Sequence, residues 1–172
     1  MINTLSLSEL MEGDILLYRS HWLFGWWIRF FEALSRLKMK YLFIAFTHQA
    51  GMLYDRECDC ISRFDAQEGH KTDFRSRVGQ AYVFRWKVPP TARQMMLYRE
   101  YLLKRRGSSY DRLAVASYLY NRISENPFDD ICSEAQTNAW IYSSYLREGK
   151  KLSPFGFYLK YRKKIDFLWV II

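Results

Sequence analysis

The stretch DDICSE, residues 129–134, decides how the rest of the chain is interpreted. Two acidic residues suited to helix capping lead directly into an amphipathic pattern that continues to about Tyr145. We therefore expect a helix with Cys132 at its N-terminus. A thiol in this position becomes a nucleophile, because the unsatisfied N–H groups and the positive end of the helix dipole favour the thiolate.

A base for this thiol is expected at His48, in the stretch THQAGMLY of residues 47–54. This histidine opens a strand-like segment rather than lying in a loop, and a paired histidine lowers a thiol pKa further. His21 and His70 lie in polar or aromatic loop-like contexts and are interpreted as solvated or structural. Cys132 and His48 are thus the predicted nucleophile and base of a thiol hydrolase.

The third member of such a site is a polar group that holds the imidazole in the right tautomer. Residues 48–54 and 60–65 have the pattern of two paired strands, with a polar connection at 55–59 between them. This pairing would bring His48 and Asp65 to the same end of the hairpin. Asp65 is therefore the expected orienting acid, and Glu68 is the alternative.

Outside this hairpin, the hydrophobic pattern predicts a mixture of strands and helices that are partly segregated along the chain, which indicates the α+β class. Pro89-Pro90 should end the strand that precedes it, and Gly107 should end the helix that follows Thr91. The further strands are expected at residues 15–19, 81–88 and 165–172, and the further helices at residues 22–37, 91–106 and 112–124.

The expected helix at residues 22–37 is rich in Trp and Phe, and its apolar residues recur at steps of three and four. Charged residues such as Arg29 and Arg36 interrupt it well before the ~20 apolar residues that a bilayer crossing needs. We expect its apolar face to pack on the core. An interfacial or acyl-chain-binding role is the alternative.

Length and composition favour one domain over residues 1–172, because a chain of this size buries a sizeable core without a metal or a disulfide scaffold. The three cysteines are an odd number, and Cys58 and Cys60 are too close for common zinc or redox spacings. We expect a reduced compartment and neither cofactor nor metal. No secretory signal or membrane-spanning run is visible, so the predicted location is cytoplasmic.

The chain carries 26 Lys and Arg against 18 Asp and Glu, a formal net charge of +8. This charge would attract anionic surfaces such as acidic lipid headgroups or a bacterial wall polymer. The basic residues are scattered, and most are interpreted as solvated helix ends and loops. No nucleic-acid module accompanies them, so no specific nucleic-acid partner is expected.

A set of short motifs follows a distinctive order between residues 12 and 146. The order resembles that of the circularly permuted NlpC-like cysteine peptidases and amidases, the YiiX-like group. In this group the histidine strand precedes the cysteine helix, whereas unpermuted papain-like enzymes have the cysteine first. The motifs are GDILL (13–17), THQAGML (47–53), FDA (64–66), GSSYD (107–111) and CSE (132–134).

The resemblance implies a permuted papain-like α+β fold, in which an antiparallel sheet packs against the cysteine-bearing helix. It implies Cys132 as nucleophile, His48 as base and Asp65 as the group that orients His48. It also implies that Tyr110 lines the substrate pocket and helps the Cys132 N–H to hold the oxyanion.

The leading functional hypothesis is a thiol hydrolase that cleaves an amide bond through a covalent thioester. Peptidoglycan stem peptides are the substrate class that the resemblance implies, and a bacterial or phage-encoded protein would meet such a substrate. Two alternatives remain open. One is a lipid-directed thiol acyltransferase or hydrolase, and the other is a catalytically inactive binding module of the same fold.

Overall fold

The structure is a computed structural model, and it describes residues 10–19, 26–27, 29–30, 33, 40–53, 56–58, 80–104, 132–147 and 152–171. A few side chains within these ranges, including that of Cys132, are not described. The helix expected at residues 112–124 lies outside the described part of the chain.

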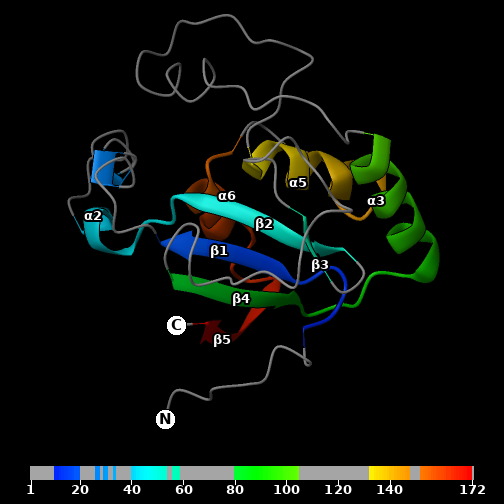
Figure 1. The fold of residues 1–172 in the computed structure, drawn as a ribbon, viewed down its shortest axis with the longest axis horizontal. Coiled ribbons are helices and arrows are strands. Elements are labelled where there is room, and N and C mark those ends of the chain that lie inside the picture. The colour runs from blue at the N-terminus through cyan, green and yellow to red at the C-terminus, as the bar shows by residue number, and fades with distance from the viewer. Residues whose placement is uncertain are drawn as a thin grey trace, which may run out of the picture.

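A five-stranded sheet forms the centre of the described chain, and each strand is antiparallel to its neighbours (Figure 1). The compact apolar run GDILL supplies the middle strand, and the C-terminal apolar run supplies an edge strand, as predicted. In spatial order the strands are β3 (Arg56–Cys58), β2 (His48–Leu53), β1 (Ile15–Arg19), β4 (Gln80–Trp86) and β5 (Ile165–Ile171).

The hairpin that follows His48 differs from the prediction. Its second strand begins at Arg56, which pairs with Leu53, whereas residues 55–59 were expected to be a polar connection. Charged residues are common on edge strands, where they discourage pairing with other chains, and their polarity is what made this segment look like a loop. Residues 60–65, the strand expected instead, lie outside the described residues.

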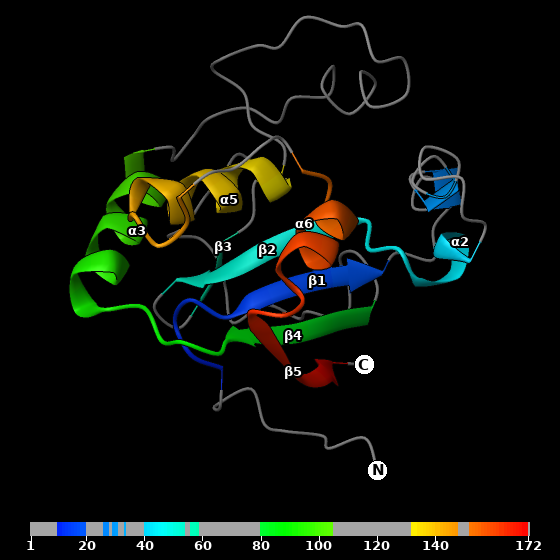
Figure 2. The same cartoon turned by 180° about the vertical axis from the view of Figure 1, so that it is seen from behind.

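Helices α3 (Ala92–Lys104), α5 (Cys132–Tyr142) and α6 (Pro154–Tyr161) pack on one face of the sheet (Figure 2). Helix α5 begins at Cys132, as predicted. Helix α3 follows Thr91, whose Oγ1 accepts a hydrogen bond from the Gln94 N–H at 3.3 Å, also as predicted. Helix α6 and the short helix α2 (Tyr41–Ile44) were not predicted.

The sheet has a buried apolar cluster on each face. The cluster under the helices joins alternate strand residues, such as Leu17 and Phe84, to Ala135 and Trp140 of α5. The other cluster contains the intervening strand residues, with Leu10 and Leu168 packed against it. Its members are Leu16, Tyr18, Ala50, Met52, Ala81 and Val83. This arrangement of an antiparallel sheet with separate helices is an α+β fold.

In the described part of the Trp-rich segment, the aromatic side chains face outward, whereas the prediction had them packed on the core. Trp26, Trp27 and Phe30 are exposed by 42%, 55% and 41%, whereas Arg29 and Ala33 are buried. A helical period shows that apolar residues share a face, but it does not show which face turns inward. The expectation that these three aromatic side chains pack on the core is therefore wrong.

Candidate thiol site at the start of helix α5

Helix α5 lies close against β2 at Gly51. A Cβ added to this glycine would lie 2.4 Å from Gln136 Oε1 and 2.5 Å from the Tyr98 hydroxyl oxygen. These two groups form a buried hydrogen bond, because the Tyr98 hydroxyl donates to Gln136 Oε1 at 2.6 Å. Only a residue without a side chain permits this contact between strand and helices.

Two contacts show that α5 runs in the same direction as β2. Gln136 lies over the glycine just described, and Trp140, one turn later, lies 3.3 Å from the position of a Cβ on Gly13. The Gly13 N–H donates to the carbonyl of Met52, which is further along β2. The opposite end of the helix, where Cys132 lies, is therefore over the beginning of β2 (Figure 1).

Gln49 lies on the sheet face that α5 covers, and the spacing along the two elements puts it near the first turn of this helix. Cys132 precedes Gln136 by four helical residues, a rise of about 6 Å. Gln49 precedes Gly51 by two strand residues, about 6.6 Å along the same face of the sheet. The Gln49 side chain is only 1% exposed, and within the described part of the chain neither its amide oxygen nor its amide nitrogen has a hydrogen-bond partner.

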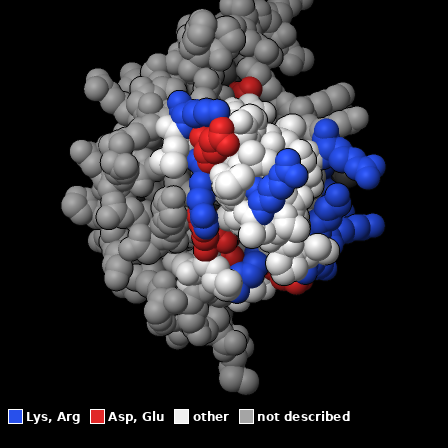
Figure 3. All heavy atoms as spheres, turned by 90° about the vertical axis from the view of Figure 1, so that its right-hand side faces the viewer, with Lys and Arg blue, Asp and Glu red and all other residues white. Residues whose placement is uncertain are grey.

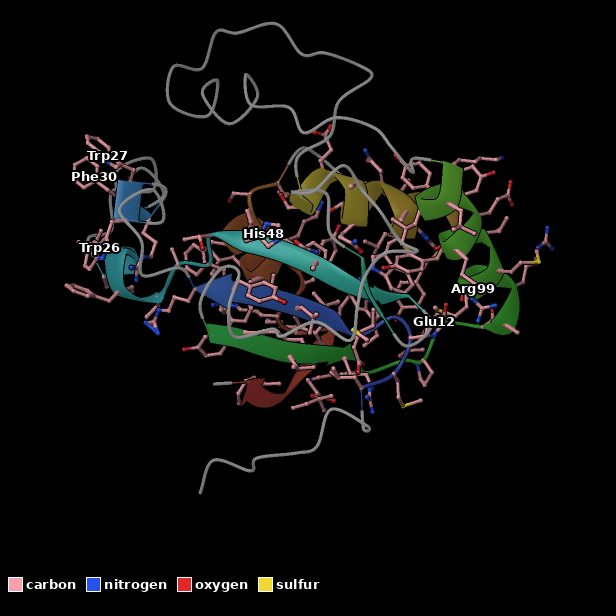
Figure 4. The ribbon with its side chains drawn as sticks, in the orientation of Figure 1. Glu12, Trp26, Trp27, Phe30, His48 and Arg99 are labelled. Atoms are coloured by element: carbon pink, nitrogen blue, oxygen red, sulfur yellow. The ribbon has the colours of Figure 1, made fainter. Side chains whose placement is uncertain are left out.

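His48 begins β2 but faces the other side of the sheet (Figure 4). It pairs with Tyr18 across β1, and the two rings lie 5.6 Å apart. Tyr18 belongs to the buried cluster opposite the helices. Successive strand residues point to opposite faces, so the one-residue step from Gln49 to His48 moves the side chain away from α5. The described structure does not bring the predicted base to the cysteine helix.

The other predicted site residues remain untested. Asp65, Glu68 and Tyr110 lie outside the described residues, and Cys132 is described by its backbone alone. Their expected roles as orienting acid, alternative acid, pocket residue and nucleophile stay predictions.

The sequence prediction missed Gln49, although a signal for it was present. A glycine inside a strand marks a close approach of another backbone or helix. Strand side chains repeat every two residues, so the residue two positions before Gly51 shares its helix-facing side. That residue is Gln49, and the glycine could have identified it.

An aromatic cavity of about 450 Å³ opens on the same face of the sheet. It is near the thiol site, because Leu17 pairs with Gln49 and Arg19 of the cavity follows two residues later on β1. The Arg19 guanidinium donates to the Tyr82 hydroxyl at 3.1 Å and to the Phe43 carbonyl. The cavity is lined by Arg19, Ile44, Phe46, Tyr82, Phe84, Phe155, Tyr158 and Phe167.

Comparison with known proteins adds no relative. No protein-family model matches the chain, and no curated protein matches it. The resemblance to the permuted papain-like enzymes therefore depends on the motifs and their order alone.

Proposed function

We propose that the chain is a thiol hydrolase that cleaves an amide bond through Cys132, in the manner of the permuted papain-like enzymes. The observations that carry this proposal are the position of Cys132 as the first residue of α5 and the buried amide of Gln49 on the sheet face that α5 covers, an amide with no hydrogen-bond partner among the described residues. A helix N-terminus favours a thiolate, and a buried amide donor favours an oxyanion.

The reaction divides into two steps. The Cys132 thiolate attacks the substrate carbonyl carbon, the C–N bond breaks, and the amine takes a proton from water as it leaves, so that the acyl group remains on the cysteine as a thioester. Water then attacks the thioester, and the carboxylic acid and the thiol are released. In both steps the Cys132 backbone N–H and the Gln49 amide N–H would donate hydrogen bonds to the carbonyl oxygen as it gains negative charge.

The substrate class is the one implied by the motif order, a peptide such as a peptidoglycan stem peptide. The formal charge of +8 supports binding to an acidic wall polymer. We also propose a phage or bacterial origin and a cytoplasmic location for the chain.

The nucleophile is tested by the rate at which iodoacetamide alkylates each cysteine, followed by mass spectrometry as a function of pH. Peptide mapping separates Cys132 from Cys58 and Cys60. We expect Cys132 to react faster than free cysteine at neutral pH, with an apparent pKa below the ordinary value of about 8.5. Reaction no faster than that of free cysteine would overturn the proposal.

The role of Gln49 is tested by turnover of a stem peptide. Gln49→Ala should lower kcat about 100-fold, as does loss of an oxyanion donor elsewhere, and should leave the alkylation of Cys132 unchanged. Gln94→Ala is the matched control, because Gln94 is a half-buried glutamine at the first turn of α3. Equal kcat values for the two variants would remove Gln49 from the mechanism.

A binding module of the same fold is the second candidate, and the position of His48 favours it. The imidazole lies on the sheet face away from α5, so in this arrangement it does not reach the thiol site. Loss of turnover in His48→Gln, with binding retained, would support the hydrolase with His48 as base. Stem-peptide binding that is equal in wild type and Cys132→Ser, with no turnover by either, would establish the binding module.

A further inference from the structure

Five large apolar side chains are exposed at one end of the molecule, next to the aromatic cavity. Trp26 contacts Phe43 edge to face, with ring centroids 6.5 Å apart, and this contact joins the segment at residues 26–30 to α2. Figure 4 shows Trp26, Trp27 and Phe30 at this end, pointing away from the sheet. The aromatic surface consists of Trp26 (42% exposed), Trp27 (55%), Phe30 (41%), Phe43 (61%) and Ile44 (47%).

The same segment buries a cation beneath these rings. Arg29 is only 3% exposed, and its guanidinium carbon lies 4.4 Å from the centre of the Trp26 ring. Burial, together with the nearby Arg19, lowers the pKa of Arg29 below its ordinary value. A segment facing only water would expose the arginine and bury the aromatic rings, so this arrangement indicates that the aromatic surface is covered in use by something apolar.

The aromatic surface continues into the cavity through Ile44, which belongs to both. The cavity of about 450 Å³ lies within the usual size range of ligand pockets, and its lining is almost entirely aromatic. Its one charged lining residue is Arg19. An apolar space next to a cation fits an acyl chain that carries an anionic headgroup.

We propose that the aromatic surface docks on a bilayer containing anionic phospholipid, and that the cavity takes an acyl chain from it. Trp and Phe side chains favour the boundary between headgroups and acyl chains, and cations attract anionic headgroups. The formal charge of +8 gives the chain the complementary sign. Each helix in the described part of the chain is too short or too polar to cross a bilayer, so the binding proposed is to the surface.

The docking surface is tested by sedimentation with phosphatidylcholine vesicles, with and without phosphatidylglycerol. Wild type should sediment with vesicles that contain phosphatidylglycerol. Trp26→Ala combined with Trp27→Ala should weaken this binding at least about tenfold, because two interfacial rings are lost. Met96→Ala is the matched control, since Met96 is 54% exposed on α3, at the opposite end of the molecule (Figure 1).

The cavity is tested by placing a carboxylate at its mouth. Ile44→Asp should weaken vesicle binding about as much as the double Trp variant, whereas Val88→Asp should have a much smaller effect. Val88 is a suitable control because it is also an exposed aliphatic residue, 70% exposed after the end of β4. Equal effects of the two substitutions would show that only net charge matters and would overturn the cavity assignment.

Two further outcomes would overturn the proposal as a whole. One is vesicle binding that the double Trp variant retains. The other is a dimeric wild type that this variant makes monomeric without any change in vesicle binding, which would assign the surface to self-association. Cys132→Ser should bind vesicles like wild type, so lipid binding and thiol chemistry can fail independently.

Discussion

Gly51 holds α5 against β2, because any side chain at this position would meet Gln136 and Tyr98. The two oxygen atoms lie 2.4 and 2.5 Å from the position of its missing Cβ, and the hydrogen bond between them is buried. Gly51→Ala should therefore destabilise the fold by about 1–3 kcal/mol, the usual cost of overpacking a core. Urea unfolding followed by circular dichroism measures this free energy.

Removal of the opposing side chain provides the control. In the double variant of Gly51→Ala and Gln136→Ala one of the two atoms that the added methyl would meet is gone, so the combined loss should be smaller than the sum of the two single losses. Strictly additive losses would show that the glycine is needed for another reason.

Asp14 and Arg85 form the second contact whose loss should be costly. Arg85 Nε and Nη2 donate to the two Asp14 carboxylate oxygens at 2.6 and 2.7 Å, and the Asp14 side chain is 1% exposed. The hydrogen bond to Asp14 is the largest cause of the raised pKa of Arg85. Asp14→Asn should destabilise by about 2 kcal/mol, because the partly buried guanidinium of Arg85 loses its charged hydrogen-bond partner.

An exposed ion pair near the end of β4 is the control for the Asp14–Arg85 pair. Lys87 Nζ lies 3.5 Å from Asp166 Oδ1, and the Asp166 side chain is 60% exposed. Asp166→Asn should change the free energy of unfolding by less than about 0.5 kcal/mol, since water screens such pairs. Comparable losses in the two variants would mean that burial does not set the strength of the Asp14 pair.

Among single residues, the sequence predicted the position of Cys132 at a helix start but not which residue at the start of β2 faces the helices. The start of a helix is determined by local sequence, namely the capping residues and the first apolar repeat. The face of a strand residue depends on register, which long-range pairing of β1 with β2 determines. For this reason a one-residue difference separated the expected His48 from the observed Gln49.

At the level of elements, four strands and the helices α3 and α5 were predicted, whereas α6 was missed. Helix α6 has only eight residues, too few for a clear helical period, although the pair Ser153-Pro154 is a typical helix start. The hairpin strand β3 was placed too late because its residues are polar. Short elements and edge strands carry weak patterns, so tertiary contacts decide them.

The start of α6 offers a prediction at this scale. Ser153 is its N-cap, and the Ser153 hydroxyl accepts a hydrogen bond from the Gly156 N–H at 3.0 Å. Ser153→Ala should cost about 1 kcal/mol in urea unfolding, and Ser153→Asp should restore most of it, because aspartate also caps helices. Failure of the aspartate to restore stability would contradict a capping role.

Among the described residues, ion pairs and the aromatic surface lie at opposite ends of the molecule. The end at α3 carries ion pairs of Arg99 with Glu12 and of Lys104 with Glu100. On this side Lys and Arg form separate groups with neutral surface between them (Figure 3). The opposite end carries the aromatic surface. A bilayer bound at the aromatic end would leave the ion-paired end in water.

Tyr145 connects the end of α5 to the end of β4. We expect its ionisation to lower the free energy of unfolding of the whole fold at alkaline pH. Its hydroxyl donates to the Val88 carbonyl at 2.6 Å, and its ring packs against Trp86 and Trp140. Burial raises the pKa of Tyr145 above its ordinary value, because the phenolate would lose hydration.

The unfolded chain ionises this phenol at about pH 10, below the folded-state pKa, so ionisation favours unfolding. The contribution of Tyr145 to stability should be complete below about pH 10 and should be lost as the pH rises through the folded-state pKa. Urea unfolding between about pH 8 and pH 11 should therefore show a steeper alkaline loss in wild type than in Tyr145→Phe. Below that range the variant should be less stable by about 1 kcal/mol, the usual worth of one hydrogen bond.

Parallel pH curves for the two proteins would contradict this prediction. They would show that Tyr145 titrates alike in the folded and unfolded chains, and that the link between α5 and β4 does not depend on its proton.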